Sequence, residues 1–165
     1  MTERRARRKP GENRERLIEA GLIEFGLFGF HGASTARIAA RAGVPQPHVY
    51  AHFATKQDLF LAVCAIAIDI VADDLAAASL LASDATALRA GARSRVDGGD
   101  EANYVTRDSA LQLLSQAIAA LGASELRAHL AELLAELRTT LGADAFRATF
   151  GTVGESALRR ALALN

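Results

Sequence analysis

Apolar residues recur along the chain every three or four positions, which is the period of an amphipathic helix. The stretch 13–28 places its apolar residues on one side of such a helix, and Gly29 and Gly32 then end it. No stretch keeps the two-residue alternation of a half-buried strand for long, and β-branched residues are sparse. The pattern therefore predicts an all-α fold.

Two short helices follow the first one and are separated by a single tight turn. The earlier of them is expected over 35–42, with Ser34 as its N-cap and Gly43 as its terminator. After the second, which ends near residue 53, Thr55 and Asp58 stand at the spacing of a capping box. A longer helix is therefore expected over 56–81.

The second half of the chain also predicts helices, but the apolar pattern is clearer for some of them than for others. Residues 84–108 give the weakest pattern, with a short helix at about 85–96 and a polar break at 97–99. Helices are expected at about 101–121, at 124–141 and at about 143–163, because a glycine follows each of the first two.

Pro45 and Pro47 stand at the start of the second short helix, Pro45 at its cap and Pro47 in its first turn. Inside a helix a proline costs ~3 kcal/mol or more, because it removes a backbone donor and clashes with the preceding turn. At the first helical positions it removes nothing, since the N–H groups there have no intrahelical acceptor. We therefore expect the helix to begin near Gln46, with Gln46 and His48 at its exposed tip and Val49 facing the core.

Two short helices joined by a glycine-containing turn are typical of a helix-turn-helix unit, and residues 34–53 fit that description. The second helix of such a unit enters the DNA major groove with its N-terminal residues at base edges. Gln46 can make two hydrogen bonds to an adenine, and His48 can donate to or accept from a base edge. The segment is therefore a candidate reader of double-stranded DNA.

The formal charge of zero is divided unevenly along the chain. Residues 1–58 carry ten Lys or Arg against six Asp or Glu, and residues 59–165 carry nine against thirteen. A basic front and an acidic rear indicate that only the front meets a polyanion, although solvated surface charge gives the same counts. Residues 1–11 are expected to form a basic flexible arm, which either lies along DNA or is a solvated tail.

The same sequence argues against several other classes of protein. Cys64 is the only cysteine, which excludes an internal disulfide, and the apolar run 59–68 is shorter than the ~20 residues of a membrane span. No apolar segment follows the N-terminal arginines, so no signal peptide is expected, and the chain is expected to be soluble, cytoplasmic and without a membrane partner.

Catalysis and metal binding find little support either. There is no phosphate-cradling glycine loop and no Gly-x-Ser-x-Gly elbow. His48 and His52 share a helix face, but no third ligand stands near them. Neither an enzyme, a metal site nor a cofactor is predicted.

Residues 12–65 resemble the N-terminal DNA-binding domain of the TetR family of transcriptional regulators. The matching pieces are RERLIEAGLIEFGLFGF, HGAS, TARIAARAGV, PHVYAHF and ATKQDLFLAV. The resemblance implies a helix-turn-helix DNA-binding domain over 12–58 and a helical dimerisation and ligand-binding domain over 59–165. It also implies contacts to the DNA backbone by five residues, which are Ser34, Thr35, Tyr50, His52 and Lys56.

The sequence departs from the family pattern at three positions. Ala33 stands where a threonine is common, so one phosphate contact is missing. Pro45 replaces a serine that usually caps the recognition helix. Arg37 replaces an acid that often closes a capping box, which leaves Arg37 freer to meet DNA.

An apolar stripe runs along each of the last two expected helices. It either packs the protein's own core or pairs with its copy in a second subunit to form an intermolecular four-helix bundle. The candidate interface residues are Leu126, Leu130, Leu133, Leu137, Phe146, Phe150, Val153 and Ala157. Gly151 and Gly154 are expected to let a neighbouring backbone come close.

Together these features predict a homodimeric repressor that a small-molecule ligand releases from a palindromic operator. A small hydrophobic ligand is expected among the helices at about 56–81, 85–96 and 101–121. The alternative is a constitutive helix-turn-helix repressor or a partner-binding module with no inducer pocket, which the short C-terminal domain keeps open.

Overall fold

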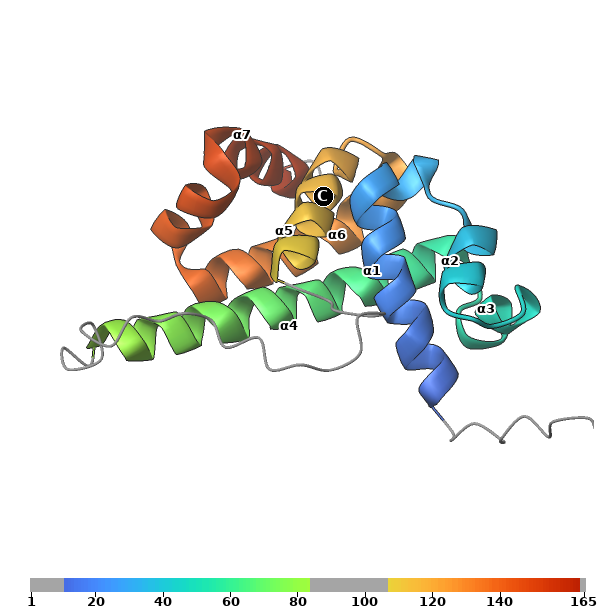
Figure 1. Ribbon diagram of the computed structural model, residues 1–165. Helices are drawn as coiled ribbons and strands as arrows, with labels where there is room; N and C mark the ends of the chain where they lie inside the picture. The colour runs from blue at the N-terminus through green and yellow to red at the C-terminus, as the bar shows by residue number, and fades with distance from the viewer. Residues whose placement is uncertain (1–10, 84–106, 164–165) are drawn as a thin grey trace, which may run out of the picture.

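The computed structural model describes residues 11–83 and 107–163. Within these ranges the chain is helical and contains no strand, as the sequence pattern predicts (Figure 1). The described helices are α1 (Glu12–Gly32), α2 (Thr35–Arg41), α3 (Pro47–His52), α4 (Lys56–Ser83), α5 (Arg107–Ala120), α6 (Ser124–Leu141) and α7 (Ala143–Ala163). The expected helix at 85–96 and the first residues of the one at 101–121 lie outside the described residues.

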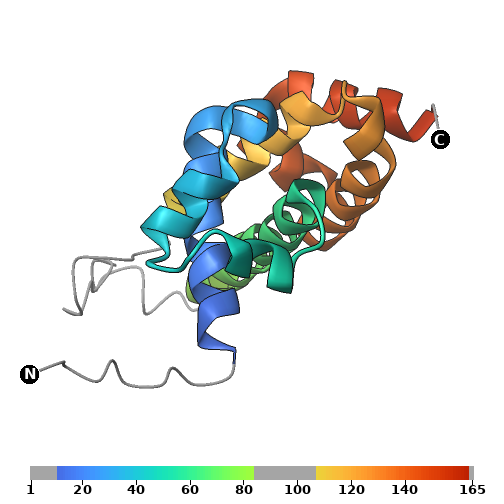
Figure 2. The same ribbon diagram turned by 90° about the vertical axis from the view of Figure 1, so that its right-hand side faces the viewer.

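The long helix α4 runs beneath the other helices in Figure 1, and α1 crosses it and packs on both α4 and α5. The short helices α2 and α3 lie at one end of the molecule, and α7 lies at the other end, above α6. Figure 2 views the molecule from the end that carries α2 and α3. The helix-turn-helix unit is therefore presented away from the rear helices.

One hydrophobic core continues from the front helices to the rear ones. The ring centroids of Phe25 on α1 and Phe60 on α4 lie 4.9 Å apart in an edge-to-face arrangement, which aromatic pairs prefer. Leu113 and Leu114 on α5 are fully buried in the same cluster. Because α1 and α4 pack directly on α5, a displacement of α5 is felt by the helices that carry the helix-turn-helix unit.

The observed helix ends agree with the sequence pattern for α6 and α7, and they differ by one or two residues for α2 and α4. Gly29 does interrupt the first helix as expected, with φ 66°, but one more turn follows it up to Gly32. The N–H of Ala33 donates to the Gly29 carbonyl and closes that turn.

Four residues of the expected dimer interface belong instead to the core of a single protomer. Leu126, Leu130, Leu137 and Phe146 have no exposed surface, because α6 packs on α4 and α7. A second copy therefore cannot reach them, and for these positions the reading as a core face is the right one. Leu133, Phe150 and Ala157 are half-buried, and Val153 is 75% exposed.

Gly151 interrupts the last helix. It breaks α7 with φ 71° and ψ 177°, a conformation that is essentially restricted to glycine, and no atom lies within 4 Å of the place where its Cβ would be. It therefore bends the helix, and the close approach of a neighbouring backbone at this position stays a prediction. Gly154 does allow a close approach, but of side chains: a Cβ there would lie 3.4 Å from Ile118 Cδ1.

Candidate nucleic-acid interface

The entry to α3 is built as the two prolines predict. Pro47 is the first residue of the helix, and the preceding turn is closed by the N–H of His48 donating to the Pro45 carbonyl at 2.9 Å. The N–H of Val49 donates to the Gln46 carbonyl at 3.0 Å. Gln46 stands at the N-cap without a side-chain capping bond, as expected from the absence of a serine at Pro45.

The N-terminal end of α3 is exposed, whereas residues further along the helix are packed against the rest of the protein. Gln46, Pro47 and His48 are all exposed, whereas Val49 is buried with 1% of its surface accessible. Phe53 follows as the C-cap and is also buried. This arrangement leaves the polar side chains at the tip able to reach a groove, because apolar anchors behind them fix the helix to the body.

Thr35 and Tyr50 join the two short helices through their hydroxyl groups, whose oxygens lie 3.2 Å apart. Thr35 is buried and Tyr50 is half exposed, so the bond fixes the tyrosine ring relative to α2. A contact from Tyr50 or Thr35 to a DNA phosphate stays a prediction, as do those of Ser34 and His52. Ser34 makes no side-chain capping bond, and His52 is exposed in the last turn of α3.

Glu24 is a buried carboxylate that the sequence analysis did not single out. Its Oε1 accepts the Ser34 N–H at 3.3 Å and an ion-pair hydrogen bond from Arg37 Nε, and only 1% of its surface is accessible. It thereby ties the middle of α1 to the first turn of α2. Its position between the apolar residues Ile23 and Phe25 could have indicated burial from the sequence. Because a buried acid is rare unless paired, burial would in turn have predicted a basic partner.

The expectation that Arg37 is freer to meet DNA is corrected by the same geometry. Besides Glu24, its Nη2 donates to the Gly32 carbonyl at 2.8 Å, and its guanidinium lies 4.6 Å from the centre of the Phe28 ring. An acid from α1 replaces the missing acid of α2, so Arg37 is fixed in place by three groups. Any contact between Arg37 and DNA would have to use guanidinium N–H groups that are not already bonded to Glu24 or Gly32.

Lys56, at the first position of α4, is held near the end of α1. Its Nζ donates to the His31 carbonyl at 3.4 Å and lies 5.0 Å from the centre of the Phe30 ring. Partial burial lowers the pKa of the Lys56 ammonium from its ordinary value; the nearby Tyr50 opposes that shift and the charge of Arg37 adds to it. The ammonium therefore gains from an anion such as a phosphate at this position.

The start of α4 is fixed by the predicted capping box. Asp58 Oδ2 accepts the Thr55 N–H at 3.0 Å, and the Asp58 N–H donates to Thr55 Oγ1 at 3.0 Å. These reciprocal bonds satisfy two backbone donors at the helix N-terminus. They set where α3 ends and α4 begins, and so the orientation of the exposed helix against the long one.

Away from this surface, α5 and α7 border an open pocket of about 540 Å³. Its walls come from α5, from the turn after it and from the second half of α7, together with Arg127 on α6. The ligand site expected from the sequence included α5 but also α4, and no residue of α4 lines this pocket. Phe150 and Val153 line it, because the bend at Gly151 brings this part of α7 over α5.

Two further observations concern the described residues alone. They contain no group of three or more His, Cys, Asp or Glu placed to hold a metal ion. No helix in the described part of the chain is long and apolar enough to cross a membrane.

Residues 17–63 match the family model for bacterial regulatory proteins of the tetR family. The chain is 44% identical over 61 residues to the HTH-type transcriptional activator FasR of Mycolicibacterium smegmatis, which covers 36% of this chain and 28% of FasR. It is 34% identical over 77 residues to the HTH-type transcriptional repressor SCO4008 of Streptomyces coelicolor, covering 42% of this chain and 40% of that repressor. The chain thus aligns with less than half the length of these curated relatives.

A crystal structure of a TetR-family transcriptional regulator from Mesorhizobium loti is similar with a TM-score of 0.44 and 21% identity, over 96% of this chain and 71% of that one. The sequence relatives are named transcriptional regulators and not enzymes. The family model spans most of α1, the whole of α2 and α3, and the start of α4. Over residues 17–63, this helix-turn-helix segment is therefore that of the tetR family of bacterial regulatory proteins.

Proposed function

We propose that the protein is a homodimeric transcriptional repressor that binds a palindromic DNA operator and is released from it by a small-molecule ligand. The observation that carries the DNA-binding part is the entry to α3, where Pro47 starts the helix and leaves Gln46 and His48 exposed. The buried Val49 and the Thr35–Tyr50 bond support it, because they hold this helix in one orientation.

Two such helices are needed to read a palindrome. In a symmetric dimer their separation would match one turn of DNA, ~34–36 Å, or a longer whole number of turns. Val153, Phe150 and Ala157 on α7 are the members of the predicted interface that keep surface in the protomer. These residues also border the pocket between α5 and α7, so the dimer proposed here uses the exposed rim of α7 at Val153. Leu126, Leu130 and Leu137 of α6 serve the protomer's core.

The pocket between α5 and α7 supports ligand control over a constitutive repressor. A ligand can release DNA only as far as it binds the released state more tightly than the bound one. Thermal-shift measurement against a set of small molecules separates the two functions. A ligand at 100 times its Kd adds ~2.7 kcal/mol of stability, and a constitutive repressor gives no such shift with any compound.

Selection of bound DNA from a random pool is the decisive experiment for the DNA-reading function. The expected result is a short inverted repeat whose half-sites are spaced by a whole number of turns. Enrichment of a single unrepeated site would contradict the dimer, and no enrichment would contradict DNA reading by α3. A promoter reporter carrying the selected site then tests repression, which matters because one of the matched relatives is an activator and the other a repressor.

A further inference from the structure

We propose that the pocket between α5 and α7 binds a small organic anion with an apolar body, and that its acid group faces Arg127 and Arg160. This assignment deepens the ligand response proposed above and rests on it for its regulatory meaning. Its binding chemistry, however, is argued from the pocket alone.

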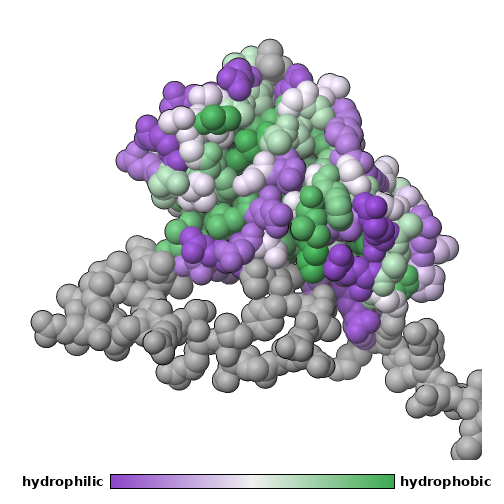
Figure 3. All heavy atoms as spheres, turned by 45° about the horizontal axis from the view of Figure 1, so that its top comes forward, coloured by the Kyte–Doolittle hydropathy of each residue, from purple (hydrophilic) through white to green (hydrophobic). Residues whose placement is uncertain are grey.

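The lining of the pocket is apolar apart from one hydroxyl and two guanidinium groups. Ile118, Leu121, Phe150 and Val153 supply large apolar surface, alanines and glycines supply the rest, and no acidic residue is among the lining residues. Figure 3, in which the top of Figure 1 comes forward, shows apolar residues in the middle of this face with hydrophilic ones around them. An uncharged ligand would use the apolar walls only, whereas an anion uses both parts of the lining.

The two arginines differ in how they are held. Arg127 is half-buried, and it donates from Nε to the Leu121 carbonyl at 3.2 Å and from Nη2 to the Gly122 carbonyl at 3.3 Å. These bonds fix its guanidinium at the turn between α5 and α6 and leave other N–H groups for a ligand. Arg160 is exposed on α7, and no ion pair to it is found within residues 11–83 and 107–163.

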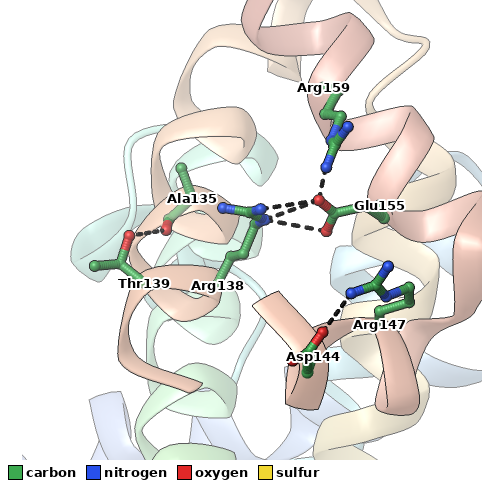
Figure 4. Close-up of polar contacts among 7 residues, drawn as sticks. All are labelled: Ala135, Arg138, Thr139, Asp144, Arg147, Glu155 and Arg159. Carbon is green, nitrogen blue, oxygen red and sulfur yellow. Dashed lines mark hydrogen bonds and ion pairs between the residues drawn. The ribbon is translucent and has the colours of Figure 1, made fainter. Parts of the chain in front are cut away.

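The acids of α7 are already used by other arginines. Figure 4 shows Glu155 between Arg138 and Arg159, and Asp144 paired with Arg147. Neither Asp144 nor Glu155 lines the pocket. The positive charge of Arg160 is therefore not compensated from its own helix, and a carboxylate in the pocket would supply that compensation through charge-assisted hydrogen bonds.

The size of the pocket agrees with a small-molecule occupant. Its volume of about 540 Å³ falls inside the ~300–1,000 Å³ typical of ligand sites, which are mostly apolar with a few placed polar groups. The body of the ligand would cover Ile118 and Phe150 and remove their remaining surface from water.

The opposite side of α5 touches the helix that leads to the DNA-reading unit. Ser115 and Ala119 line the pocket, while Gln116 packs so closely on Gly29 of α1 that a Cβ there would lie 3.0 Å from Gln116 Oε1. The helix α2 starts at Thr35, six residues after Gly29. A ligand that shifts α5 therefore presses on α1 just before the helix-turn-helix unit.

Titration calorimetry of the full chain with decanoate, and with decanol as its uncharged match, tests the proposal. Decanoate is expected to bind saturably with one molecule per pocket, at least tenfold more tightly than decanol. Arg160→Met should weaken decanoate about 10- to 100-fold, the loss of a charge-assisted bond, and leave decanol unchanged. Arg159→Met, which removes the same charge one residue away outside the pocket, should change neither affinity more than about twofold.

A third variant tests the location. Ala157→Phe fills the pocket from α7 and should abolish decanoate binding while the protein keeps its melting temperature within a few degrees. The proposal is overturned if decanol binds as well as decanoate, if Arg159→Met and Arg160→Met act alike, or if the wild-type chain binds neither probe. It is equally overturned if Ala157→Phe changes only the oligomeric state, because a second copy would then occupy the groove.

The effect of decanoate on the affinity for DNA is measured in a separate experiment. Decanoate binding that depends on Arg160 but leaves the affinity for the selected DNA unchanged would support the pocket assignment and contradict ligand release. Loss of DNA binding on saturation with decanoate, and its retention in Arg160→Met at the same concentration, would support both.

Discussion

At the scale of single residues, the proposed DNA-binding surface depends on where the backbone of α3 begins. Pro47 as the first helical residue fixes that point within one position, because its ring admits one φ and it lacks the N–H that a helix interior would need. Gln46 and His48 flank it and are exposed. Under the proposed function, their side chains are the polar groups that this end of the helix offers to base edges.

Replacing Gln46 or His48 with alanine is expected to relax base preference. Each lost bidentate contact costs ~1–3 kcal/mol at one base pair and less elsewhere, so the selected sequence should become degenerate at that position. Competition binding with single-base variants of the operator measures this. Gln112→Ala, an exposed glutamine on α5, is the control, and unaltered preference in both α3 variants would contradict the assignment of α3 as the reading helix.

Glu24 on α1 is expected to stabilise the contact between α1 and α2. Glu24→Gln keeps an acceptor for the Ser34 N–H but removes the charge that Arg37 pairs with. A hydrogen bond to a charged group contributes ~1.5–3 kcal/mol, and because Arg37 is half exposed and regains water, the expected loss of unfolding free energy lies at the lower end, ~1.5 kcal/mol. Urea unfolding measures it.

A matched control is the exposed pair between Arg16 and Glu12, where Arg16→Gln should cost no more than ~0.5 kcal/mol. An equal loss in Glu24→Gln and Arg16→Gln would show that the buried carboxylate has no special role. A loss only in Glu24→Gln, accompanied by weaker DNA binding, would assign it the positioning of α2.

The same residues show what local sequence reasoning can and cannot reach. The start of α3 and the capping box at Thr55 and Asp58 follow from chemistry within a few positions, so both were predictable. The partner of Arg37 lies 13 residues away on another helix, and only the packing of α1 on α2 brings it there. Likewise, the periodicity of Leu126 and Leu130 is the same for a core and for an interface, and only burial separates the two.

At the scale of elements, α7 is two helical pieces joined at Gly151. The bend lets Phe146 before it enter the core while Val153 and Ala157 after it line the pocket. The second piece is tied back to α6 by Glu155, which accepts hydrogen bonds from Arg138 Nε at 3.0 Å and from Arg159 Nε at 3.0 Å (Figure 4). The bend and the ion pairs together place the wall of the pocket.

Gly151→Ala is expected to destabilise the protein by ~1–3 kcal/mol, because φ 71° with ψ 177° is nearly closed to residues with a Cβ. Thermal and urea unfolding both measure the loss. Gly26→Ala is the control: Gly26 is helical and its added Cβ would meet α5 only at ordinary contact, 3.7 Å, so no loss and up to ~1 kcal/mol of gain is expected. An unchanged or higher stability of Gly151→Ala would contradict the bend.

Glu155 makes the attachment of α7 to α6 dependent on pH. The hydrogen bond from Arg138 holds the pKa of Glu155 below its ordinary range, burial opposes this, and Arg159 adds to it. Since the folded pKa is lower than the unfolded one, the stabilisation is complete above the unfolded value of about 4.3 and is lost as the pH falls through the folded value.

The melting temperature of Glu155→Gln should therefore lie below that of the wild type at pH 7, and the difference should shrink once the pH falls below about 4. Asp144→Asn removes an acid whose side chain is 97% exposed and should give a smaller difference at pH 7. A difference in Glu155→Gln that stays constant down to pH 2 would assign its effect to shape and not to charge.

At the scale of the whole molecule, the continuous core makes the front and rear helices one folding unit. The proposed dimer must therefore use apolar residues that are exposed on the surface of the protomer. On α7 this is above all Val153. Leu133 is half-buried against the core, so a charge there would disturb the fold as well as any interface.

Val153→Asp is accordingly expected to shift the protein from dimer to monomer in sedimentation experiments without lowering its melting temperature by more than a few degrees. Binding to a palindromic site should weaken strongly, while binding to a half-site should stay the same. Ile66→Asp, which also charges an exposed apolar position, but on α4, is the control. A Val153→Asp protein that remains dimeric would place the subunit contact elsewhere.

The length of α4 has a mechanical consequence. At ~1.5 Å per residue its 28 residues form a rod of about 42 Å, anchored by the capping box directly behind α3. A tilt of about 5° about one end of such a rod moves the other end by nearly 4 Å, which exceeds the ~3 Å length of a hydrogen bond. A rotation of α4 that is small at each packing contact would therefore displace α3 at its start. In the proposed complex with DNA, it would move the recognition helix relative to the bases.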